Sequence, residues 1–524
     1  MKQFRSKRKL NESIMEGANI LADAVGVTLG PRGRNVIIKG KDLKPVITKD
    51  GVTVAKFIDL EDPFKNLGAQ VIKQASEATN NSAGDGTTTS TIIARAILSK
   101  AQIHLSNNVS PIELKRGIDL ATEELVSRLQ ELSKPVSSKE EIEQIATISA
   151  NGDKGIGKLI STAVDQVGKD GAISIQEANS NETSLELSEG FRFDSGLLAN
   201  AFITDERRGS MRHDDCLILV TDRSVSTIDD ILPCLEIAAR DGRPLIIIAE
   251  DISGQALAAM IMNAMKGSMR VAAIKAPRYG EERRNILSDL SISVGATFIS
   301  RDSGIPMRSV KLEHFGKAQT VESNKFLTTI VGGDQDDNEV EKRIESLKSE
   351  INQEGSLSEC EKVQERITRL ASAVAIIKVG GLTEVEMIEK KHRVEDALEA
   401  VNSAQQEGII AGGSSALLRV SNNLSIETEN PTQQLGVDIL KGALREPFRQ
   451  MVSNAGLSPD IYLDKVENHK NKESGLNVAT GEIVNMFAYG IIDPFKVVRC
   501  AVQNASSAAS TLLLTDFAIV EAKE

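Results

Sequence analysis

The sequence predicts a multidomain α/β protein in which a mostly helical region is interrupted by an inserted α/β domain. Three observations lead to this fold class. The chain has 524 residues, 40% of them hydrophobic, which is enough for two to four domains with sizeable cores. Residues 11–130 have a mostly helical pattern, and Ala-rich helical character returns after Gly408. Between these regions, from about residue 190 to 370, short β runs alternate with helical segments.

The helical first third also contains two short β runs. The stretches "NVIIKG" and "PVITKDGVTV" have the composition of strands, and Lys49-Asp50-Gly51 predicts a hairpin-like turn within the second.

The inserted domain is predicted to contain a partly parallel sheet. Its helical segments are residues 226–240, 254–267 and 280–294, and its β runs are "CLILVTD", "PLIIIAED", "RVAAIKA" and "ATFIS". Strands that alternate with helices are joined by crossover connections, which favour parallel pairing. Charged amphipathic helix follows over residues 338–370. Two apolar stripes there predict an αα-hairpin packed on one face, namely Val340, Ile344, Leu347 and Ile351, then Val363, Ile367 and Leu370.

Composition excludes several classes of function. Aromatic residues make up only 3% of the chain, with no Trp, and the net charge is −12, so a nucleic-acid partner is not expected. The four cysteines, which are Cys216, Cys234, Cys360 and Cys500, are far apart and form no CxxC, which predicts reduced thiols and no zinc site. No apolar leader and no uncharged apolar stretch of ~18 residues is present. We therefore expect a soluble cytoplasmic protein without a membrane partner.

The stretch "NNSAGDGTTTSTI", residues 80–92, carries the first chemical signal. It places Asp85 between two glycines and follows it at once with three threonines. Backbone N–H groups and threonine hydroxyls at a helix start bind phosphate oxygens, and Mg²⁺ is commonly held by one carboxylate together with phosphates. The apolar run from Ile92 onward suits a buried helix that starts near Thr88. A plain Gly-Asp turn followed by a Thr N-cap explains the same residues, and the stretch alone leaves both interpretations open.

Other segments supply the remaining parts of a phosphoryl-transfer site. "TLGPRGRN" and "GIIAGGSSA" are glycine-rich turns that can approach a ligand closely, "TKDG" supplies Asp50, and "RVEDALEA" places Asp396 on a helix. A Walker-type P-loop is not expected. Residues 152–158 match GxxxxGK, but Leu159 stands where a Ser or Thr is required, and no apolar strand precedes the motif.

Several long motifs resemble those of the group I chaperonin (GroEL-type) family. They run in the family's order from about residue 10 to 515: "VTLGPRGRNV", "TKDGVTVAK", "LGAQVIK", "AGDGTTT", "GRPLIIIAEDISGQALA", "IKVGG", "EVEMIEKKHRVEDAL", "QEGIIAGG" and "GIIDPFKV". One departure is Ser414, which stands where the family has a third consecutive glycine.

The resemblance implies three domains and a ring assembly. The equatorial ATPase domain would comprise residues 1–131 and 408–524, the intermediate domain 132–189 and 374–407, and the apical client-binding domain 190–373. The implied cofactors are ATP and Mg²⁺, with K⁺ as a further candidate ion. The implied partners are non-native polypeptides, further copies in one or two seven-membered rings, and a co-chaperonin lid.

The resemblance also assigns the ATP site. It implies that Asp85 is the Mg²⁺ ligand and that Asp50 and Asp396 are the catalytic carboxylates near the attacking water. The implied nucleotide-binding residues are Thr28, Leu29, Gly30, Pro31, Lys49, Asp85, Gly86, Thr87, Thr88, Thr89, Gly413, Asn477, Val478 and Asp493.

Client and lid binding are assigned to an apolar rim on the apical domain. The implied positions are Leu197, Ala201, Phe202, Leu232, Leu235, Leu257, Ile261 and Met262. Exposed apolar patches mark interaction sites, and Met adapts to varied partners. The competing interpretation is that apolar residues on several faces of a helix belong to a core.

The leading functional prediction is an ATP-dependent chaperonin that captures non-native polypeptides in a ring cavity and uses ATP hydrolysis to promote their folding. The alternative is a client-binding ring, such as a specialised paralogue, with little productive turnover. The presence of Asp50, Asp85 and Asp396 favours the first, because a decayed ATPase is expected to lose one of them. A metabolic kinase is disfavoured because no acceptor-substrate pocket is suggested.

Overall fold

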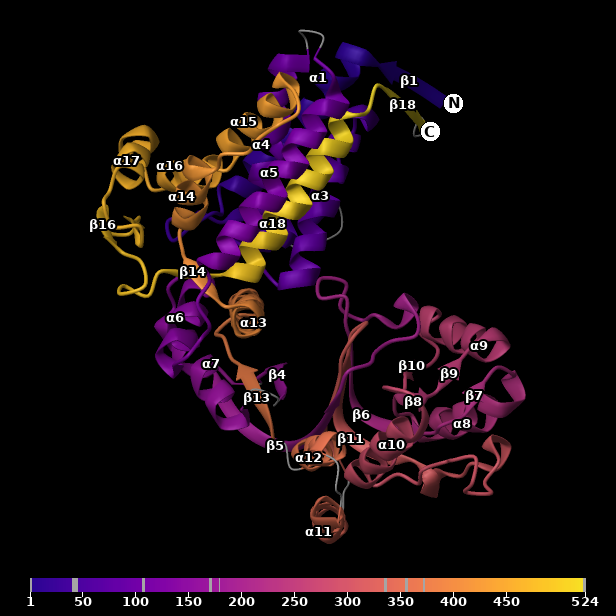
Figure 1. Cartoon of the computed structure of the whole chain (residues 1–524). Helices are drawn as coiled ribbons and strands as arrows, with labels where there is room; N and C mark the ends of the chain where they lie inside the picture. The colour runs from indigo at the N-terminus through magenta and orange to yellow at the C-terminus, as the bar shows by residue number, and fades with distance from the viewer. Residues whose placement is uncertain are drawn as a thin grey trace. The chain divides into compact units, whose positions relative to one another are not determined.

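The computed structural model describes residues 2–39, 46–105, 109–168, 172–178, 180–333, 337–353, 357–370 and 373–521. The chain forms two compact units (Figure 1). Unit 1 comprises residues 1–162 and 381–524, and unit 2 comprises residues 163–380. Unit 2 therefore interrupts unit 1, as the predicted insertion requires. The finer division into three domains stays a prediction.

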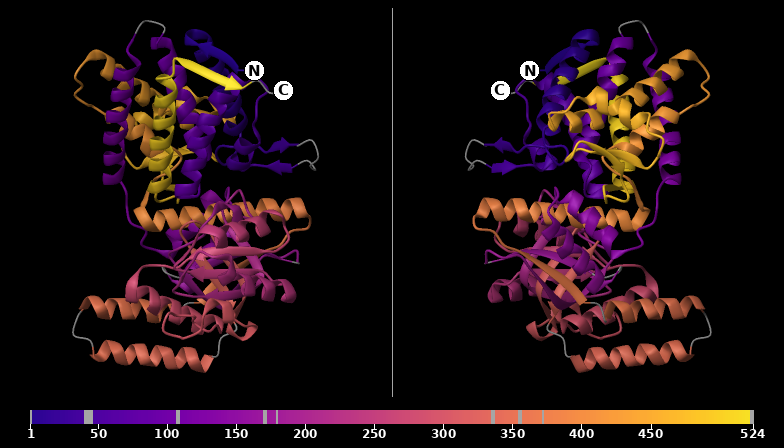
Figure 2. Two further views of the ribbon diagram at one scale, coloured as in Figure 1. Left: turned by 90° about the vertical axis from the view of Figure 1, so that its right-hand side faces the viewer. Right: turned by 90° about the vertical axis from the view of Figure 1, so that its left-hand side faces the viewer.

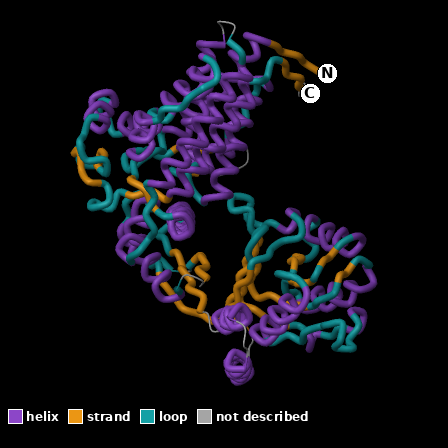
Figure 3. Tube along the Cα trace, viewed as in Figure 1, coloured by secondary structure: helices purple, strands orange, loops and turns teal. Residues whose placement is uncertain are grey.

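Unit 1 is mostly helical, whereas strands gather in unit 2 (Figure 3). The helices of unit 1 are α1 (Lys7–Gly26), α2 (Gly51–Phe57), α3 (Pro63–Ala83), α4 (Thr87–Leu105), α5 (Pro111–Glu131), α6 (Lys139–Ser149), α7 (Lys154–Val167, which ends in unit 2), α13 (Glu384–Glu407), α14 (Ser415–Asn423), α15 (Pro431–Ala443), α16 (Glu446–Asn454), α17 (Pro459–Glu467) and α18 (Phe495–Leu513). Its strands are β1 (Lys2–Ser6), β2 (Val36–Ile38), β3 (Val46–Thr48), β14 (Ile409–Ala411), β15 (Ser474–Asn477), β16 (Glu482–Asn485), β17 (Ile492–Pro494) and β18 (Phe517–Glu521).

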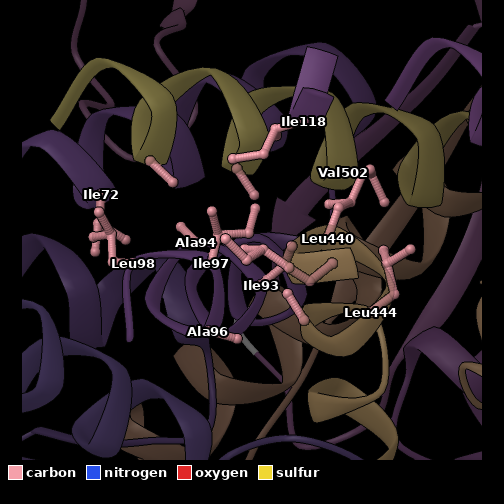
Figure 4. Close-up of a cluster of buried hydrophobic side chains, with 14 of the residues drawn as sticks. Ile72, Ile93, Ala94, Ala96, Ile97, Leu98, Ile118, Leu440, Leu444 and Val502 are labelled. Carbon is pink, nitrogen blue, oxygen red and sulfur yellow. The ribbon is translucent and has the colours of Figure 1, made fainter. Parts of the chain in front are cut away.

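The core of unit 1 is built around α4. Ile92, Ile93 and Ile97 of this helix are fully buried, as expected of a helix that is apolar on all sides. Figure 4 shows Ile93 and Ile97 among side chains of α3, α5, α15 and α18, including Leu440 and Val502. Helices from both ends of the sequence thus share one core, which explains why the first and last thirds fold together. β1 and β18 pair antiparallel, so the chain ends lie side by side (Figure 1).

The predicted turn at Lys49-Asp50-Gly51 is wrong. β2 and β3 pair antiparallel as a hairpin that projects from the helices of unit 1 (Figure 2), and Gly51 already begins α2. Asp50 is the N-cap of that helix, because its carboxylate accepts the Val52 and Thr53 N–H groups, each at 3.0 Å. An aspartate followed by glycine is favoured both in turns and at the N-cap of a helix. Here Asp50 forms the N-cap.

The helices of unit 2 are α8 (Ile228–Asp241), α9 (Gly254–Met265), α10 (Gly280–Val294), α11 (Asp337–Gln353) and α12 (Leu357–Leu370), with short 3₁₀ turns at Asn200–Phe202, Met307–Ser309 and Leu312–His314. Its strands are β4 (Ala172–Glu177), β5 (Ser184–Phe193), β6 (Met211–Val220), β7 (Ser224–Val225), β8 (Leu245–Ala249), β9 (Asp251–Ile252), β10 (Val271–Lys275), β11 (Gly316–Ser323), β12 (Thr328–Gly333) and β13 (Ala373–Val379).

An eight-stranded sheet organises unit 2, in the order β10-β8-β6-β11-β12-β5-β13-β4. The β10, β8 and β6 strands are parallel, and α8 and α9 are the helices predicted between their β runs. The fourth predicted run, "ATFIS", forms only a single parallel bridge between Thr221 and Ile299 and is not a strand of the sheet. The predicted αα-hairpin is present as α11 and α12, which pack through Leu347, Val363 and Ile367.

Candidate functional site

A large cavity in unit 1 collects every residue predicted for nucleotide binding and catalysis. Its volume is about 760 Å³, a size suited to a small-molecule ligand. Its lining includes Thr28, Leu29, Gly30, Pro31, Lys49, Asp50, Asp85, Gly86, Thr87, Thr88, Thr89, Asp396, Gly413, Asn477, Val478 and Asp493. These residues come from segments far apart in the chain, and all belong to unit 1. The fold thus brings them together, while the role of each stays a prediction.

The turn that leads into α4 presents backbone N–H groups to this cavity. Gly86 adopts a φ of 93°, and α4 begins at Thr87. The N–H of Ser90 donates to the Gly86 carbonyl at 2.9 Å, which closes the first turn of the helix. The N–H groups of residues 87–89 therefore have no carbonyl acceptor within the helix. Such groups, together with the helix dipole, bind anions such as phosphate.

Threonine hydroxyls line the same end of the cavity. The Thr87 Oγ1 is buried and lacks a hydrogen-bond partner within the described part of the chain. A buried hydroxyl left unpaired costs about 1–3 kcal/mol, which a phosphate oxygen would offset. The Thr88 Oγ1 lies 3.4 Å from the Thr28 Oγ1. A Cβ at Gly51 would lie 2.5 Å from the Thr88 Oγ1, so only glycine leaves room for this hydroxyl.

Gly84 brings the turn between α3 and α4 against α13. It has a φ of 73°, and a Cβ at this position would overlap the side chain of Glu399. Asp396 precedes Glu399 by three residues, so the two side chains lie on the same face of α13. The close approach at Gly84 therefore turns this face toward the cavity, which Asp396 lines.

Asp85 is a buried carboxylate at the phosphate-binding end. Its Oδ1 accepts the Gly86 N–H at 2.5 Å, and the carboxylate also accepts the hydroxyl of Ser149. Burial is the main cause that raises the pKa of Asp85, and the negative charge of Asp50 raises it further, whereas the two hydrogen bonds lower it. A cation bound beside Asp85 would offset both burial and repulsion.

Asp493 adds a third carboxylate to this region. Burial and the charge of Asp85 raise the pKa of Asp493 to about 6, against the N–H groups of Gly413 and Ser414, which donate to it. Asp85 is thus repelled by both Asp50 and Asp493. Across the described ranges, no group of three or more His, Cys, Asp or Glu residues could hold a metal ion by itself. The donor set fits Mg²⁺, which takes its remaining ligands from phosphate and water.

Lys49 places a cation at the cavity wall. Its Nζ donates to the Gly30 carbonyl and to the Asn151 Oδ1, both at 3.0 Å. Burial, followed by the charge of Arg393, lowers the pKa of Lys49, whereas Glu389 opposes this effect. These bonds connect the loop after α1 to the loop between α6 and α7.

The wall on the side of β15 and β17 is largely apolar. Met451, Leu476, Val478 and Ile492 line it, and a Cβ at Gly413 would lie 3.6 Å from the Met451 Cε. An apolar wall of this kind suits the flat face of a nucleobase. The cavity thus has an anion-binding end and an apolar wall.

Sequence reasoning missed several lining segments, among them the turn of α18 with Val497, Val498 and Ala501, and two others supply polar or aromatic side chains. The first is the end of α6 and the loop to α7, which contributes Ser149, Asn151 and Lys154. The GxxxxGK match falls here, but α6 precedes it and Asp153 caps α7 through the Gly155 N–H at 2.9 Å, so the exclusion of a P-loop holds. The second is residues 489–492, immediately before Asp493. The GxxxxGK match and the family motif "GIIDPFKV" fall in these segments, but neither showed that the segments line this cavity, because their residues reach it only through tertiary packing.

The predicted apolar rim of unit 2 divides by burial. Leu232, Ala201 and Met262 are exposed, and Leu197, Leu257 and Ile261 are partly buried. In contrast, Leu235 and Phe202 are only 6% and 2% exposed and belong to the core of unit 2. At these two positions the core interpretation fits the described conformation, because their helix or turn packs them onto the sheet. Client binding by the other positions stays a prediction.

Two predictions from composition can be compared with the structure directly. The four cysteines are free thiols, of which Cys216, Cys234 and Cys500 are buried. None of the helices in the described ranges is long and apolar enough to span a membrane.

Comparisons with known proteins place this geometry in context. A model of the TCP-1/cpn60 chaperonin family matches residues 21–524. Among solved structures, the chain is similar to the chaperonin gp146 from the bacteriophage EL 2 (Pseudomonas aeruginosa), crystallised in the presence of ATP-BeFx. The two share 21% sequence identity over 99% of each chain, with a TM-score of 0.69. At this identity the likeness shows a common fold.

Proposed function

The chain belongs to the TCP-1/cpn60 chaperonin family, and we propose that its unit 1 cavity binds MgATP and hydrolyses it to drive the folding of captured polypeptides. Family membership confirms the predicted family and the chaperone function. The proposal concerns the finer statement, which is that this chain is itself a Mg²⁺-dependent ATPase and that the residues named above carry the reaction.

The observation that carries the proposal is the convergence of three kinds of group on a single cavity. The start of α4 supplies N–H donors and hydroxyls for phosphates, and an apolar wall can accept a base. Asp50, Asp85 and Asp396 supply the carboxylates. Phosphoryl transfer needs little more than this, because its catalysis consists mainly of positioning and charge stabilisation.

Each group then has a defined task. The N–H groups of residues 87–89 and the Thr hydroxyls bind phosphate oxygens. The ammonium group of Lys49 faces the negative charge of the phosphates. Asp396 and Asp50 accept hydrogen bonds from the attacking water and orient it toward the terminal phosphorus. Asp493, fixed by the N–H groups of Gly413 and Ser414, binds the ribose hydroxyls.

Asp85 would hold Mg²⁺ together with phosphate oxygens. Bound Mg²⁺ supplies neutralisation of the phosphate charge that develops as the terminal bond breaks. K⁺ is proposed as a further ion of the site on the family resemblance alone.

Unit 2 is proposed to bind clients and a lid through its exposed apolar side chains. Leu232 and Met262 are 44% and 56% exposed. Ala201, another member of the predicted set, is also exposed. Assembly into seven-membered rings, one or two per particle, belongs to the same proposal.

The alternative is a client-binding ring with little productive turnover. Asp396 separates the two, because a catalytic carboxylate has no task in a ring that only binds. Asp396→Ala should slow single-turnover hydrolysis of bound ATP by about 100-fold or more, the usual contribution of a positioned acid–base group. Affinity for MgATP should stay within about threefold, because this carboxylate orients water and does not hold phosphate.

The matched control is Asp85→Ala, which should instead weaken Mg²⁺-dependent binding. Client refolding yields measured on the same preparations connect hydrolysis to function. Wild-type turnover by Asp396→Ala would reject the assigned role, and client capture without any ATP-dependent refolding would support the alternative.

A further inference from the structure

An exposed aromatic ring stands at the wall of the cavity and has no part in the chemistry described so far. Tyr489 is 63% exposed and belongs to the cavity lining. Of the three tyrosines in the chain, Tyr489 is the one that lines this cavity.

The loop that carries Tyr489 is held firmly in place. The Tyr489 N–H donates to the Asn485 carbonyl at 3.1 Å, and the Ile491 N–H donates to the Met486 carbonyl at 2.8 Å. The Asn485 side chain accepts the Ala488 N–H at 3.1 Å and donates to Glu473 at 3.1 Å. A ring on such a loop is presented at a fixed position, which lowers the entropy that ligand binding must overcome.

The backbone that follows Tyr489 is anchored to other walls of the cavity. Gly490 has a φ of 67°, and a Cβ there would lie 2.6 Å from the side chain of Gln144 on α6. The Gly412 N–H donates to the Ile491 carbonyl at 2.9 Å. The two residues after Tyr489 therefore lie against α6 and against the turn that leads into α14.

The position along the chain limits the distance between Tyr489 and Asp493. Residues 489–493 all line the cavity, and four residue steps span at most about 13–14 Å. Asp493 lies close enough to Asp85 for the two charges to interact. This limit allows a nucleotide with its phosphates at α4 and its ribose at Asp493 to place its base near Tyr489.

We infer that Tyr489 is a specificity-determining residue whose ring stacks on the purine base of the bound nucleotide. This inference rests on the proposed function and adds an aromatic ring to the apolar wall that accepts the base. Stacking on an aromatic side chain strengthens the binding of a base without hydrogen-bond readout, so it favours large purines over small pyrimidines.

The test compares ligands with and without a base. Tyr489→Ala should weaken MgATP binding by about 5- to 150-fold in calorimetry, the range of single-base stacking. Competition by magnesium tripolyphosphate, which has no base, should be unchanged. Tyr489→Phe should retain wild-type affinity for MgATP. The matched control is Tyr279→Ala, which removes an exposed tyrosine of unit 2. It should change the affinity for neither MgATP nor magnesium tripolyphosphate.

A second measurement does not depend on affinity. MgATP should quench tyrosine emission in the wild type and not in Tyr489→Phe, although that variant still binds. Equal losses for MgATP and tripolyphosphate in Tyr489→Ala, or no loss for either, would overturn the stacking role while leaving the proposed function intact. A wild-type protein that binds no MgATP would instead reject the proposed function.

Discussion

The two units of this molecule differ in how their predicted sites relate to the fold. In unit 1, every predicted nucleotide-binding and catalytic residue lines the same cavity. In unit 2, the predicted client-binding residues divide between surface and core, and Leu232 and Leu235 of the same helix differ from 44% to 6% exposed. The first site is assembled from polar and glycine-rich turns, whereas the second is assembled from apolar side chains.

This difference has a physical cause. Glycine with positive φ, an aspartate between glycines, or threonines at a helix start have few uses other than turns, caps and ligand sites. An apolar residue on an amphipathic helix looks the same whether it packs on a sheet or faces a client. Polar sites are therefore easier to recognise in a sequence than apolar binding surfaces.

The largest expected effect separates the two kinds of leucine on α8. Leu235→Ser should destabilise unit 2 by about 3–5 kcal/mol, because it opens a cavity and buries a hydroxyl. Leu232→Ser should change stability by about 0.5 kcal/mol or less and should weaken capture of a denatured protein. Thermal unfolding and limited proteolysis measure the first effect, and a client aggregation assay measures the second.

The comparison between the units would fail if the two variants behaved alike. A stable Leu235→Ser protein that only loses client binding would mean that unit 2 exposes this side chain in its working conformation. A destabilised Leu232→Ser protein would place that residue in a core as well.

The sequence predicted more of the fold than of the local geometry. The helix–strand alternation located the insertion and the parallel strands β6, β8 and β10 of its sheet, because periodicity follows burial directly. It gave no β run for the other five strands of that sheet, which are β4, β5, β11, β12 and β13. The local sequence predicted a turn at Asp50, where the structure has a helix cap, because the same residues favour both. It passed over Ser149 and Tyr489, which become part of the site only when α6 and the loop before β17 pack around the cavity. The resemblance to chaperonins, and not spacing, assigned the roles of Asp396 and Asp493.

The next largest expected effect is that of Asp493 on stability, because this carboxylate is buried in the unit 1 cavity. The pKa of Asp493 is raised to about 6 from 3.8, so the folded state holds its proton more tightly than the unfolded state does. The free energy of unfolding therefore falls as pH rises from about 4 to about 6, because the Asp493 carboxyl loses its proton. Above about pH 6 this destabilising contribution has reached its full size. Asp493→Asn should stabilise the nucleotide-free protein by about 3 kcal/mol at pH 7.5.

Unfolding midpoints of the two proteins at several pH values check this sign. The advantage of Asp493→Asn should shrink as pH falls from about 7 toward 4. A constant difference across that range would show that the carboxyl does not titrate with the fold.

The smallest effect concerns the turn beside Asp493. Ser414 adopts a φ of 60°, which costs a residue with a Cβ about 1 kcal/mol relative to glycine. Ser414→Gly should therefore raise the free energy of unfolding by up to about 1 kcal/mol, less the added freedom of the unfolded chain. Gly413→Ala is the reverse substitution at the neighbouring residue, where φ is 58°. It should lower the free energy of unfolding, because it adds a Cβ at a positive φ. The same sign for both changes, measured by denaturant unfolding, would contradict this account.

The central claim is that the start of α4 and Asp85 form a Mg²⁺-dependent ATP site in unit 1. Calorimetric titration of ATP into the wild type and Asp85→Ala, each with Mg²⁺ and with a chelator, tests it most directly. We predict binding by the wild type that is strongly enhanced by Mg²⁺, and no enhancement in Asp85→Ala, because that carboxylate is the proposed metal ligand. The same Mg²⁺ enhancement in both proteins would contradict the assignment of the site.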